Sequence, residues 1–356
     1  MGSMSEVRIL LPDNSVKVFD HEPSALEVAQ SIGPRLAKDT LGVKINGQTE
    51  VSDLRLPLKD GSKIQLITTK SQEAVEVIRH SAAHVMAQAV QSIWPDVKVT
   101  IGPVIENGFF YDFDSPRNFT EEDFPAIEKK MQEIISKGYP LIRKEVPVND
   151  AISTFTKMHE RFKVEIIEDL KAKGENKVSI YDQGDWFDLC RGPHVQSTGQ
   201  IKAVKLLSVA GAYWRGDEKN PMLQRIYATA FGDKKDLDQY LINIEEAKKR
   251  DHRKLGKELG LFTFHELAPA SPFFTGRGTV IYNELQKYIR ELYFKYGYQE
   301  VITPQVFDIS LFKTSGHLAN YKENMFFTNV DERDFGLKPM NCPSHCLLFK
   351  SEHHSY

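Results

Sequence analysis

The sequence has few cysteines and no long apolar run. Its 356 residues include 3 cysteines, Cys190, Cys342 and Cys346, far below the density of a disulfide scaffold, so we expect a cytoplasmic protein in a reducing environment. No apolar stretch approaches the roughly 18 residues that span a bilayer, and we expect no membrane association. Lysine and arginine total 46 against 49 aspartate and glutamate, which restricts any RNA contact to a local basic patch.

The length predicts two or three domains, at roughly 150 residues per domain. Within residues 7–68, short alternating stretches lie on both sides of a helix that Ser24 and Glu27 open with capping-box spacing. Turns are expected at residues 12–14 and 46–47. This ββαββ order in so few residues predicts a ubiquitin-like β-grasp module.

A long amphipathic helix is predicted over residues 71–94 and is ended by Pro95. Its apolar stripe has the i, i+3, i+4 spacing of a packed helix face. The stripe consists of Val75, Ile78, Ala82, Val85, Met86, Ala89 and Ile93. At about 100° per residue, His80 and His84 fall roughly opposite this stripe, so neither is expected to be a core histidine.

The remaining elements mix strands and helices. Hairpins are predicted at residues 107–108 and 183–184, and a capped helix at residues 120–138. Residues 233–259 predict a highly charged connecting helix. A further αβ pattern begins near residue 261 and is still in progress at the last residue of the sequence.

Two pairs of residues form the first candidate site. His80 and His84 are four apart, so on a helix their imidazoles can aim at one atom. Cys190 and His194 flank a Gly-Pro turn. Two histidines, a cysteine and a third histidine are ligand types of a tetrahedral zinc site, and equally the groups with which a hydrolase holds a water and a leaving hydroxyl. Ser81 stands where a zinc protease has its general-base glutamate, which excludes that class; a structural role stays open.

A second candidate site follows near the end of the sequence. Cys342, His345 and Cys346, completed by His353 or His354, have spacing that allows a local zinc site. A strand-to-helix turn with incidental thiols explains the same residues equally well.

Several longer strings resemble those of bacterial threonyl-tRNA synthetases. They are HSAAH at 80–84, DLCRGPH at 188–194, AYWRGD at 212–217, LQRIYATAF at 223–231, KRDHRKLGKELGLF at 249–262 and KPMNCPSH at 338–345. Together with the β-grasp module that precedes them, they cover nearly the whole chain. Several are long enough to be specific to that family.

The resemblance implies a multidomain α+β chain. It implies a TGS domain of β-grasp fold at residues 1–69, an α/β editing domain at 70–232, a linker helix at 233–260 and the start of a class II catalytic domain, built on an antiparallel sheet, at 261–356. Residues 295–304 resemble class II motif 1, whose helix and strand form a homodimer interface in the family.

The resemblance also implies the residues of an editing site. They are His80, His84, Lys163, Asp188, Cys190 and His194. Because the family's editing site is understood to work without a bound metal, zinc becomes the second explanation for the histidine and cysteine quartet. Cys342 matches a zinc ligand of the catalytic domain, whose other two ligands are histidines further along the chain.

The implied activity is attachment of L-threonine to tRNA(Thr) through a threonyl-adenylate, with ATP and Mg²⁺ as substrate and one zinc ion per subunit. Editing hydrolyses mischarged seryl-tRNA(Thr). Serine lacks one methyl group relative to threonine, and binding alone discriminates such a difference by only about 1–3 kcal/mol. A separate hydrolytic site removes the serine that binding alone cannot reject. A zinc ion that takes the amine and the hydroxyl of threonine as ligands would reject valine, which lacks the hydroxyl.

Motifs 2 and 3 of class II synthetases do not occur before Tyr356. We therefore expect the chain to carry the editing part and not to activate threonine alone, and we interpret its length as a cut point. Two alternatives stay open. One is a free-standing seryl-tRNA(Thr) deacylase, and the other is a non-catalytic tRNA-binding module built on the TGS unit.

Overall fold

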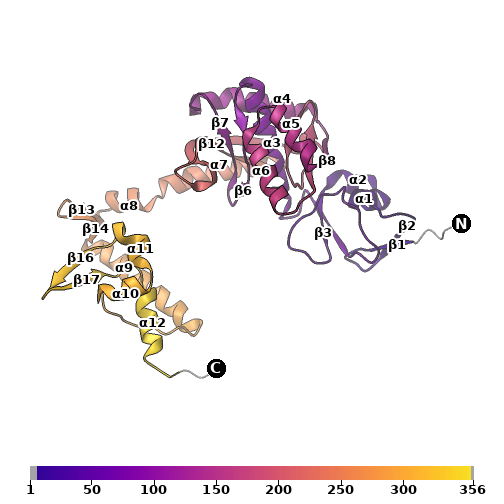
Figure 1. Cartoon of the computed structure of the whole chain (residues 1–356). Coiled ribbons are helices and arrows are strands. Elements are labelled where there is room, and N and C mark those ends of the chain that lie inside the picture. Colours follow the sequence, from indigo (N-terminus) through magenta and orange to yellow (C-terminus); the bar gives the residue numbers. More distant parts are fainter. Residues whose placement is uncertain (1–5, 354–356) are drawn as a thin grey trace. The chain divides into compact units, whose positions relative to one another are not determined.

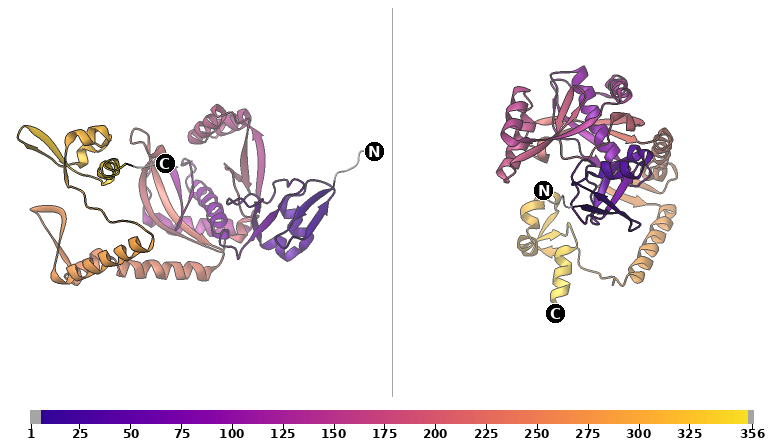
Figure 2. Two further views of the ribbon diagram at one scale, coloured as in Figure 1. Left: turned by 90° about the horizontal axis from the view of Figure 1, so that it is seen from below. Right: turned by 90° about the vertical axis from the view of Figure 1, so that its right-hand side faces the viewer.

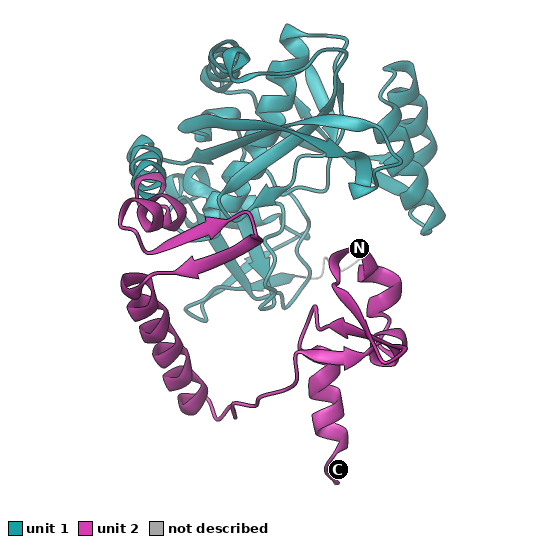
Figure 3. Ribbon diagram, turned by 90° about the vertical axis from the view of Figure 1, so that its left-hand side faces the viewer, with its two compact units in different colours: residues 1–247 teal, residues 248–356 magenta. Residues whose placement is uncertain are grey.

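The computed structural model describes residues 6–353 (Figure 1). The chain divides into two compact units between residues 247 and 248 (Figure 3). That division falls inside the segment 233–260, which the sequence predicts as a linker. One residue of the alternative zinc site, His354, lies outside the described residues.

The first unit opens with a β-grasp module in which two helices, and not the single predicted helix, lie between the two strand pairs, because Pro34 starts a second helix after Gly33. Its elements are β1 (Val7–Leu10), β2 (Val16–Phe19), α1 (Ala25–Ile32), α2 (Pro34–Asp39), β3 (Thr40–Ile45) and β4 (Ile64–Thr68). β1 pairs antiparallel with β2 and β3 with β4, and a parallel bridge from Leu10 to Lys63 joins the two ladders. Ser24 and Glu27 form the predicted capping box at the start of α1.

The turn at residues 46–47 opens a longer connection than a two-residue hairpin. β3 pairs with β4, and Ile45 lies opposite Ile64. Leu54 and Leu58, between these strands, are buried in the core of the module. The connection is therefore a loop from which Leu54 and Leu58 reach the core, while residues 46–50 are exposed.

Helix α3 (Ala74–Ile93) packs against strands β7 (Gly108–Asp114) and β12 (Met222–Phe231) and against helix α4 (Phe124–Lys137) (Figure 2). All residues from 81 to 90 are buried, so α3 has no solvent face there. The prediction that His84 is not a core residue is therefore wrong, since its side chain is only 4% exposed. Periodicity identifies the apolar stripe but not the segment that covers the opposite face.

Two antiparallel sheets complete the first unit. The larger has the order β11-β12-β7-β5, with β6 paired to β7, and the smaller has the order β10-β9-β8. Their remaining strands are β5 (Lys98–Val99), β6 (Val104–Ile105), β8 (Leu141–Pro147), β9 (Lys177–Gln183), β10 (Trp186–Leu189) and β11 (Ala203–Tyr213). The predicted hairpins at 107–108 and 183–184 are confirmed by these pairings. Helices α5 (Val148–Lys157) and α6 (Arg161–Ala172) share a small core with the smaller sheet.

The charged connector is two helices and not the single helix that the sequence predicts. α7 (Lys234–Lys249) and α8 (His252–Glu258) are separated at Asp251, whose φ of −55° and ψ of 123° are not helical. The Asp251 carboxylate accepts a hydrogen bond from the Arg253 N–H at 2.8 Å. Aspartate is a strong N-cap residue, and this capping bond starts a new helix.

The second unit is built from short antiparallel sheets and helices. A hairpin joins β13 (Phe262–His265) to β14 (Ala268–Phe274), and a second sheet has the order β15-β17-β16. The other elements are α9 (Gly276–Lys295), β15 (Val306–Asp308), α10 (Ile309–Thr314), α11 (His317–Tyr321), β16 (Phe327–Val330), β17 (Arg333–Leu337) and α12 (Cys342–Lys350). In the part of the chain that the structure describes, no helix combines the length and apolarity of a membrane span.

Candidate functional site

The four residues of the predicted quartet meet at one point. His80 and His84 are one turn apart on α3, while Cys190 and His194 lie on the segment that follows β10. One possible ligand atom of each residue lies within 4.8 Å of the others. The ring centroid of His194 is 4.3 Å from that of His80 and 4.2 Å from that of His84. The structure thus brings all four residues together.

The thiol of Cys190 is the polar centre of this quartet. Its Sγ lies 3.1 Å from Nε2 of His80 and 3.3 Å from Nε2 of His194. The N–H of Gly192 also donates to Sγ, at 3.3 Å. A thiol has a single proton, so it can donate to only one of the two imidazoles.

The hydroxyl of Ser81 sets the tautomer of His194. It donates its only proton to the Val77 carbonyl at 2.8 Å and accepts from the Val195 N–H at 3.0 Å. Its third contact, 3.2 Å to Nδ1 of His194, is therefore a hydrogen bond that the ring donates. Because a neutral imidazole has one N–H, Nε2 of His194 faces the sulfur of Cys190 with a lone pair.

Burial keeps the quartet uncharged at neutral pH. Loss of hydration lowers the pKa of His80 to about 4 and the pKa of His84 to about 3. It also lowers the pKa of His194 well below its ordinary value. The same desolvation raises the pKa of the Cys190 thiol to about 12. The site therefore presents three neutral imidazoles and a protonated thiol.

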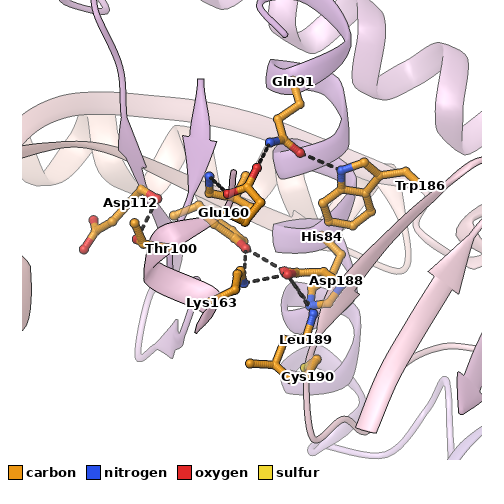
Figure 4. A network of polar contacts seen from close by, with 12 residues as sticks. His84, Gln91, Thr100, Asp112, Glu160, Lys163, Trp186, Asp188, Leu189 and Cys190 are labelled. Atoms are coloured by element: carbon orange, nitrogen blue, oxygen red, sulfur yellow. Dashed lines mark hydrogen bonds and ion pairs between the residues drawn. The ribbon is translucent and has the colours of Figure 1, made fainter. Parts of the chain in front are cut away.

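A charged cluster of Lys163, Asp188 and Tyr111 adjoins the quartet. Figure 4 shows Lys163 and Asp188 beside His84. Lys163 on α6 and Asp188 on β10 form a 2.6 Å ion pair with side chains 3% and 2% exposed. Asp188 also accepts from the Tyr111 hydroxyl at 2.7 Å and the Leu189 N–H at 2.8 Å. Lys163 Nζ donates to the Tyr111 oxygen at 3.1 Å. Three donors on one carboxylate offset much of the cost of burying its charge.

His84 links the two groups. Its Nε2 lies 4.0 Å from Oδ2 of Asp188. Its Nδ1 is buried and, within residues 6–353, has no hydrogen-bond partner. Trp186 packs edge-on against the His84 ring with a centroid distance of 5.9 Å, and its indole N–H donates to Gln91. Gln91 donates in turn to Glu160 at 2.7 Å (Figure 4), so a partly buried chain of polar contacts supports Trp186 against His84.

Tyr111 is the candidate that the sequence analysis missed. It lies in the aromatic run of β7, where alternation predicts only core packing. Burial raises the pKa of its phenol well above the ordinary value, so the hydroxyl remains a donor. A Cβ at Gly102 would lie 2.3 Å from the Tyr111 ring, and glycine there leaves room for it. No sequence pattern distinguishes this hydroxyl from the neighbouring phenylalanines.

Three members of the quartet, His80, His84 and Cys190, and the charged cluster line one cavity of about 820 Å³, within the range of known ligand sites. Its ionisable and thiol wall residues are His80, His84, Tyr111, Arg143, Glu145, Lys163, Glu175, Lys177, Asp188, Cys190 and Arg191. His194 is absent from this wall and is fully buried behind it. The arrangement combines neutral proton acceptors with a fixed ion pair at the surface of a ligand-sized cavity.

The quartet also has the donor types of a zinc site. Among the described residues it is the one group of three or more such side chains that could hold a metal ion. The orphaned Nδ1 of His84 and the lone pair of His194 suit a cation as well as a water. However, a thiolate ligand would be required, and burial raises the pKa of Cys190 to about 12. The geometry of the quartet thus fits both a zinc site and a site that holds a water, while the raised pKa of the Cys190 thiol favours the water.

Cys342 has no such surroundings. It is exposed at the first turn of α12, and its thiol belongs to no group of three possible ligands within the described part of the chain. The local zinc site that spacing allows, with His345, Cys346 and His353, is therefore not formed by the described residues.

Comparison with known proteins gives two domain matches. Residues 7–68 match the TGS domain. Residues 178–227 match the threonyl and alanyl tRNA synthetase second additional domain. The second range contains Asp188, Cys190 and His194, which contribute to the two clusters described above.

Similar proteins extend the match along the chain. The threonine–tRNA ligase of Bdellovibrio bacteriovorus is 73% identical over 99% of this chain and 54% of its own length. That of Citrifermentans bemidjiense is 51% identical over 99% of this chain and 55% of its own length. The crystal structure of the RNA binding domain of threonyl-tRNA synthetase from Cryptosporidium parvum covers 30% of this chain and 27% of that one at 50% identity, and its TM-score of 0.29 is too low to inform the fold.

The chain spans about half the length of the curated relatives it matches. Its identity to them extends across both compact units and includes the TGS and second additional domains. This chain is therefore a homologue of the bacterial threonine–tRNA ligases that carries the TGS domain and the second additional domain of that family.

Proposed function

We propose that the cavity is an editing site that hydrolyses the aminoacyl ester of mischarged seryl-tRNA(Thr). The observation that carries this proposal is the convergence of the uncharged quartet and the charged cluster on one cavity. Relatives named threonine–tRNA ligase and the match to the second additional domain support it. Lys177 and Arg191 on the cavity wall have the charge that suits the phosphates of an RNA end.

Ester hydrolysis needs a held water, a group that polarises the carbonyl and a proton for the leaving ribose hydroxyl. In our proposal the neutral imidazoles of His80 and His84, with Asp188, hold the water, and an imidazole accepts its proton as the water attacks the ester carbonyl. The imidazolium then gives this proton to the ribose oxygen as the ester bond breaks. Lys163 orients or polarises the ester through its fixed positive charge. Cys190 is a poor nucleophile because burial raises the pKa of its thiol to about 12, so water and not sulfur attacks the ester.

Discrimination between serine and threonine requires a second, hydrolytic site for a physical reason. Serine is the smaller substrate and enters any pocket that accepts threonine, with a binding loss of only about 1–3 kcal/mol for the missing methyl group. A hydrolytic cavity that accepts the seryl ester and excludes the larger threonyl ester adds a second selection step. Specificity for serine is therefore a matter of cavity shape near the charged cluster.

For the whole protein we propose the organisation that the sequence predicts, with domains at 1–69, 70–232, 233–260 and 261–356. Its substrates would be L-threonine, tRNA(Thr) and ATP with Mg²⁺, and it would act as a cytoplasmic homodimer. One zinc ion per subunit would bind Cys342 together with ligands beyond the described residues. Exposed apolar side chains in and after α9, such as Phe294 at 91% and Ile302 at 95%, support an interface there.

Alanine at His84 or Asp188 should remove most of the editing activity. Each substitution deletes a group that positions or deprotonates the water, and we expect the deacylation rate constant to fall by about 100-fold or more. Release of labelled serine from seryl-tRNA(Thr) in single-turnover assays measures it. His252→Ala, on α8, is the matched control and should retain the wild-type rate. If His84→Ala and Asp188→Ala both deacylate at the wild-type rate, the site assignment is wrong.

Chelation distinguishes the two explanations of the quartet. We expect dialysis against a chelator to leave deacylation within twofold of the untreated rate, because the buried imidazoles and Asp188 are sufficient to hold water. Metal analysis should then find no zinc that depends on Cys190, with Cys346→Ser as the control for thiol loss. One zinc ion per chain that disappears in Cys190→Ser, together with loss of activity on chelation, would identify a metal centre instead.

Stability should depend on pH through the buried imidazoles. Their folded-state pKa values, about 4 for His80 and about 3 for His84, lie below the unfolded value near 6.5. The unfolded chain therefore binds protons first as pH falls, so this stability is complete above about pH 6.5 and is lost toward pH 4. Each imidazole contributes a slope of about 1.4 kcal/mol per pH unit in that window.

His84→Gln should lower the slope of the free energy of unfolding against pH by about 1.4 kcal/mol per pH unit, since it removes one of the two imidazoles. Urea unfolding of the first unit, followed by tryptophan fluorescence at several pH values between 4.5 and 7, measures the slope. Comparison with the wild type cancels other groups such as Glu160, whose pKa is raised by burial and which acts in the opposite direction. Equal slopes in the two proteins would contradict a buried, neutral His84.

A further inference from the structure

Asp53 of the β-grasp module forms a hydrogen bond with Tyr181 on β9, outside the module. Asp53 lies between β3 and β4, and its side chain is only 2% exposed. Its Oδ1 accepts from the Arg55 N–H at 2.8 Å, and its Oδ2 accepts from the Tyr181 hydroxyl at 2.7 Å. Burial of Tyr181 on β9, followed by the charge of Asp53, raises the pKa of the phenol, so Tyr181 remains a donor.

The loop that carries Asp53 is fixed within its own module. Ser52 and Val43 exchange two backbone hydrogen bonds, at 2.7 and 3.1 Å. Leu54 is buried in the module core, and its carbonyl accepts from the Leu26 N–H at 3.1 Å. The position of the Asp53 carboxylate is therefore set by the β-grasp fold itself.

Tyr181 contacts the turn that presents His194. The two ring centroids are 4.4 Å apart, with an angle of 72° between the ring planes. A Cβ at Gly192 would lie 2.1 Å from the Tyr181 hydroxyl oxygen, and Gly192 has a φ of +78°. Only glycine fits this turn beneath the hydroxyl. The Tyr181 hydroxyl thus lies between Asp53 and the backbone of the turn.

The module also holds the residues that follow His194. The side-chain amide of Gln196 donates to the carbonyls of Ala37 and Thr40, both at 2.7 Å. That of Gln200 donates to the Lys38 carbonyl at 2.9 Å. Contacts from the module therefore hold the chain before His194, through Tyr181, and after it, through these two amides.

We propose that the β-grasp module is a positioning element of the editing site, in which Asp53 acts through Tyr181 on His194. His194 does not line the cavity, but its Nε2 faces Cys190 and its ring packs on His80 and His84, which do. Displacement of His194 therefore changes the orientation of the groups that meet the substrate. This inference rests on the proposed function and adds to it a requirement for the TGS domain.

The test is a double-mutant cycle in the full chain. Tyr181→Phe keeps the ring on His194 and removes the hydroxyl, and Asp53→Ala removes its acceptor. We expect each to lower the single-turnover rate of seryl-tRNA(Thr) deacylation by about tenfold, with the KM within twofold of wild type, because the cavity wall is intact and only its alignment changes. The double variant should be no slower than the slower single variant, since both changes break one chain of contacts.

Lys44→Gln is the matched control. It breaks a 2.6 Å ion pair between the module and Glu73, at the start of α3, without touching Tyr181. Wild-type deacylation in Tyr181→Phe, or effects that multiply in the double variant, would overturn the inference. If Asp53→Ala does not fold, Tyr181→Phe decides the matter alone, because it leaves the packing of the ring unchanged.

A second readout separates this inference from the proposed function. The imidazole nitrogen signals of His194 in NMR spectra should shift in Tyr181→Phe and remain unchanged in Lys44→Gln. Unchanged His194 signals in Tyr181→Phe would contradict the proposal that Tyr181 positions His194, whatever the deacylation rate of this variant. A wild-type chain that releases no serine would instead overturn the proposed function, and the NMR result would still decide whether Tyr181 positions His194.

Discussion

Burial of the α3 face that carries His80 and His84 is the constraint on which the site depends. An imidazole deprived of water is stable only in its neutral form, so the pKa values fall to about 4 and about 3. A neutral ring has one donor and one acceptor, and in this interior each needs a partner. The segment of residues 190–195 supplies two of them to His80, the Cys190 thiol and the Pro193 carbonyl, whereas Nδ1 of His84 has no hydrogen-bond partner among the described residues.

Charge is concentrated beside these histidines, since Oδ2 of Asp188 lies 4.0 Å from Nε2 of His84. Lys163 and Asp188 form a buried pair that would be costly if either partner were alone, and the Tyr111 hydroxyl and Leu189 N–H complete the bonding of the carboxylate. The cavity thus combines neutral, proton-accepting groups with neighbouring charged, polarising groups. This combination suits a reaction in which water loses a proton while charge develops on an ester oxygen. It also explains why elements from α3, α6, β7 and β10 must be brought to one place.

Residue types predicted part of this arrangement. The i, i+4 histidines on a helix, the Cys-x-x-x-His turn and the capping box at Ser24 carry local information, and the structure contains each of them. Burial of His84 could not be predicted, because helix periodicity does not show what covers the opposite face. The role of Tyr111 is hidden in an aromatic strand. The bond from Tyr181 to Asp53, 128 residues apart, depends on packing between the β-grasp module and the smaller sheet, which no local pattern encodes.

The central claim is that this cavity discriminates the seryl from the threonyl ester of one tRNA. The most direct measurement compares single-turnover deacylation of seryl-tRNA(Thr) and threonyl-tRNA(Thr) by this polypeptide alone, under the same conditions. We predict rapid release of serine and release of threonine that is slower by at least about tenfold, since one methyl group must be rejected by shape. No release of serine above the spontaneous rate, or equal release of both amino acids, would contradict the central claim.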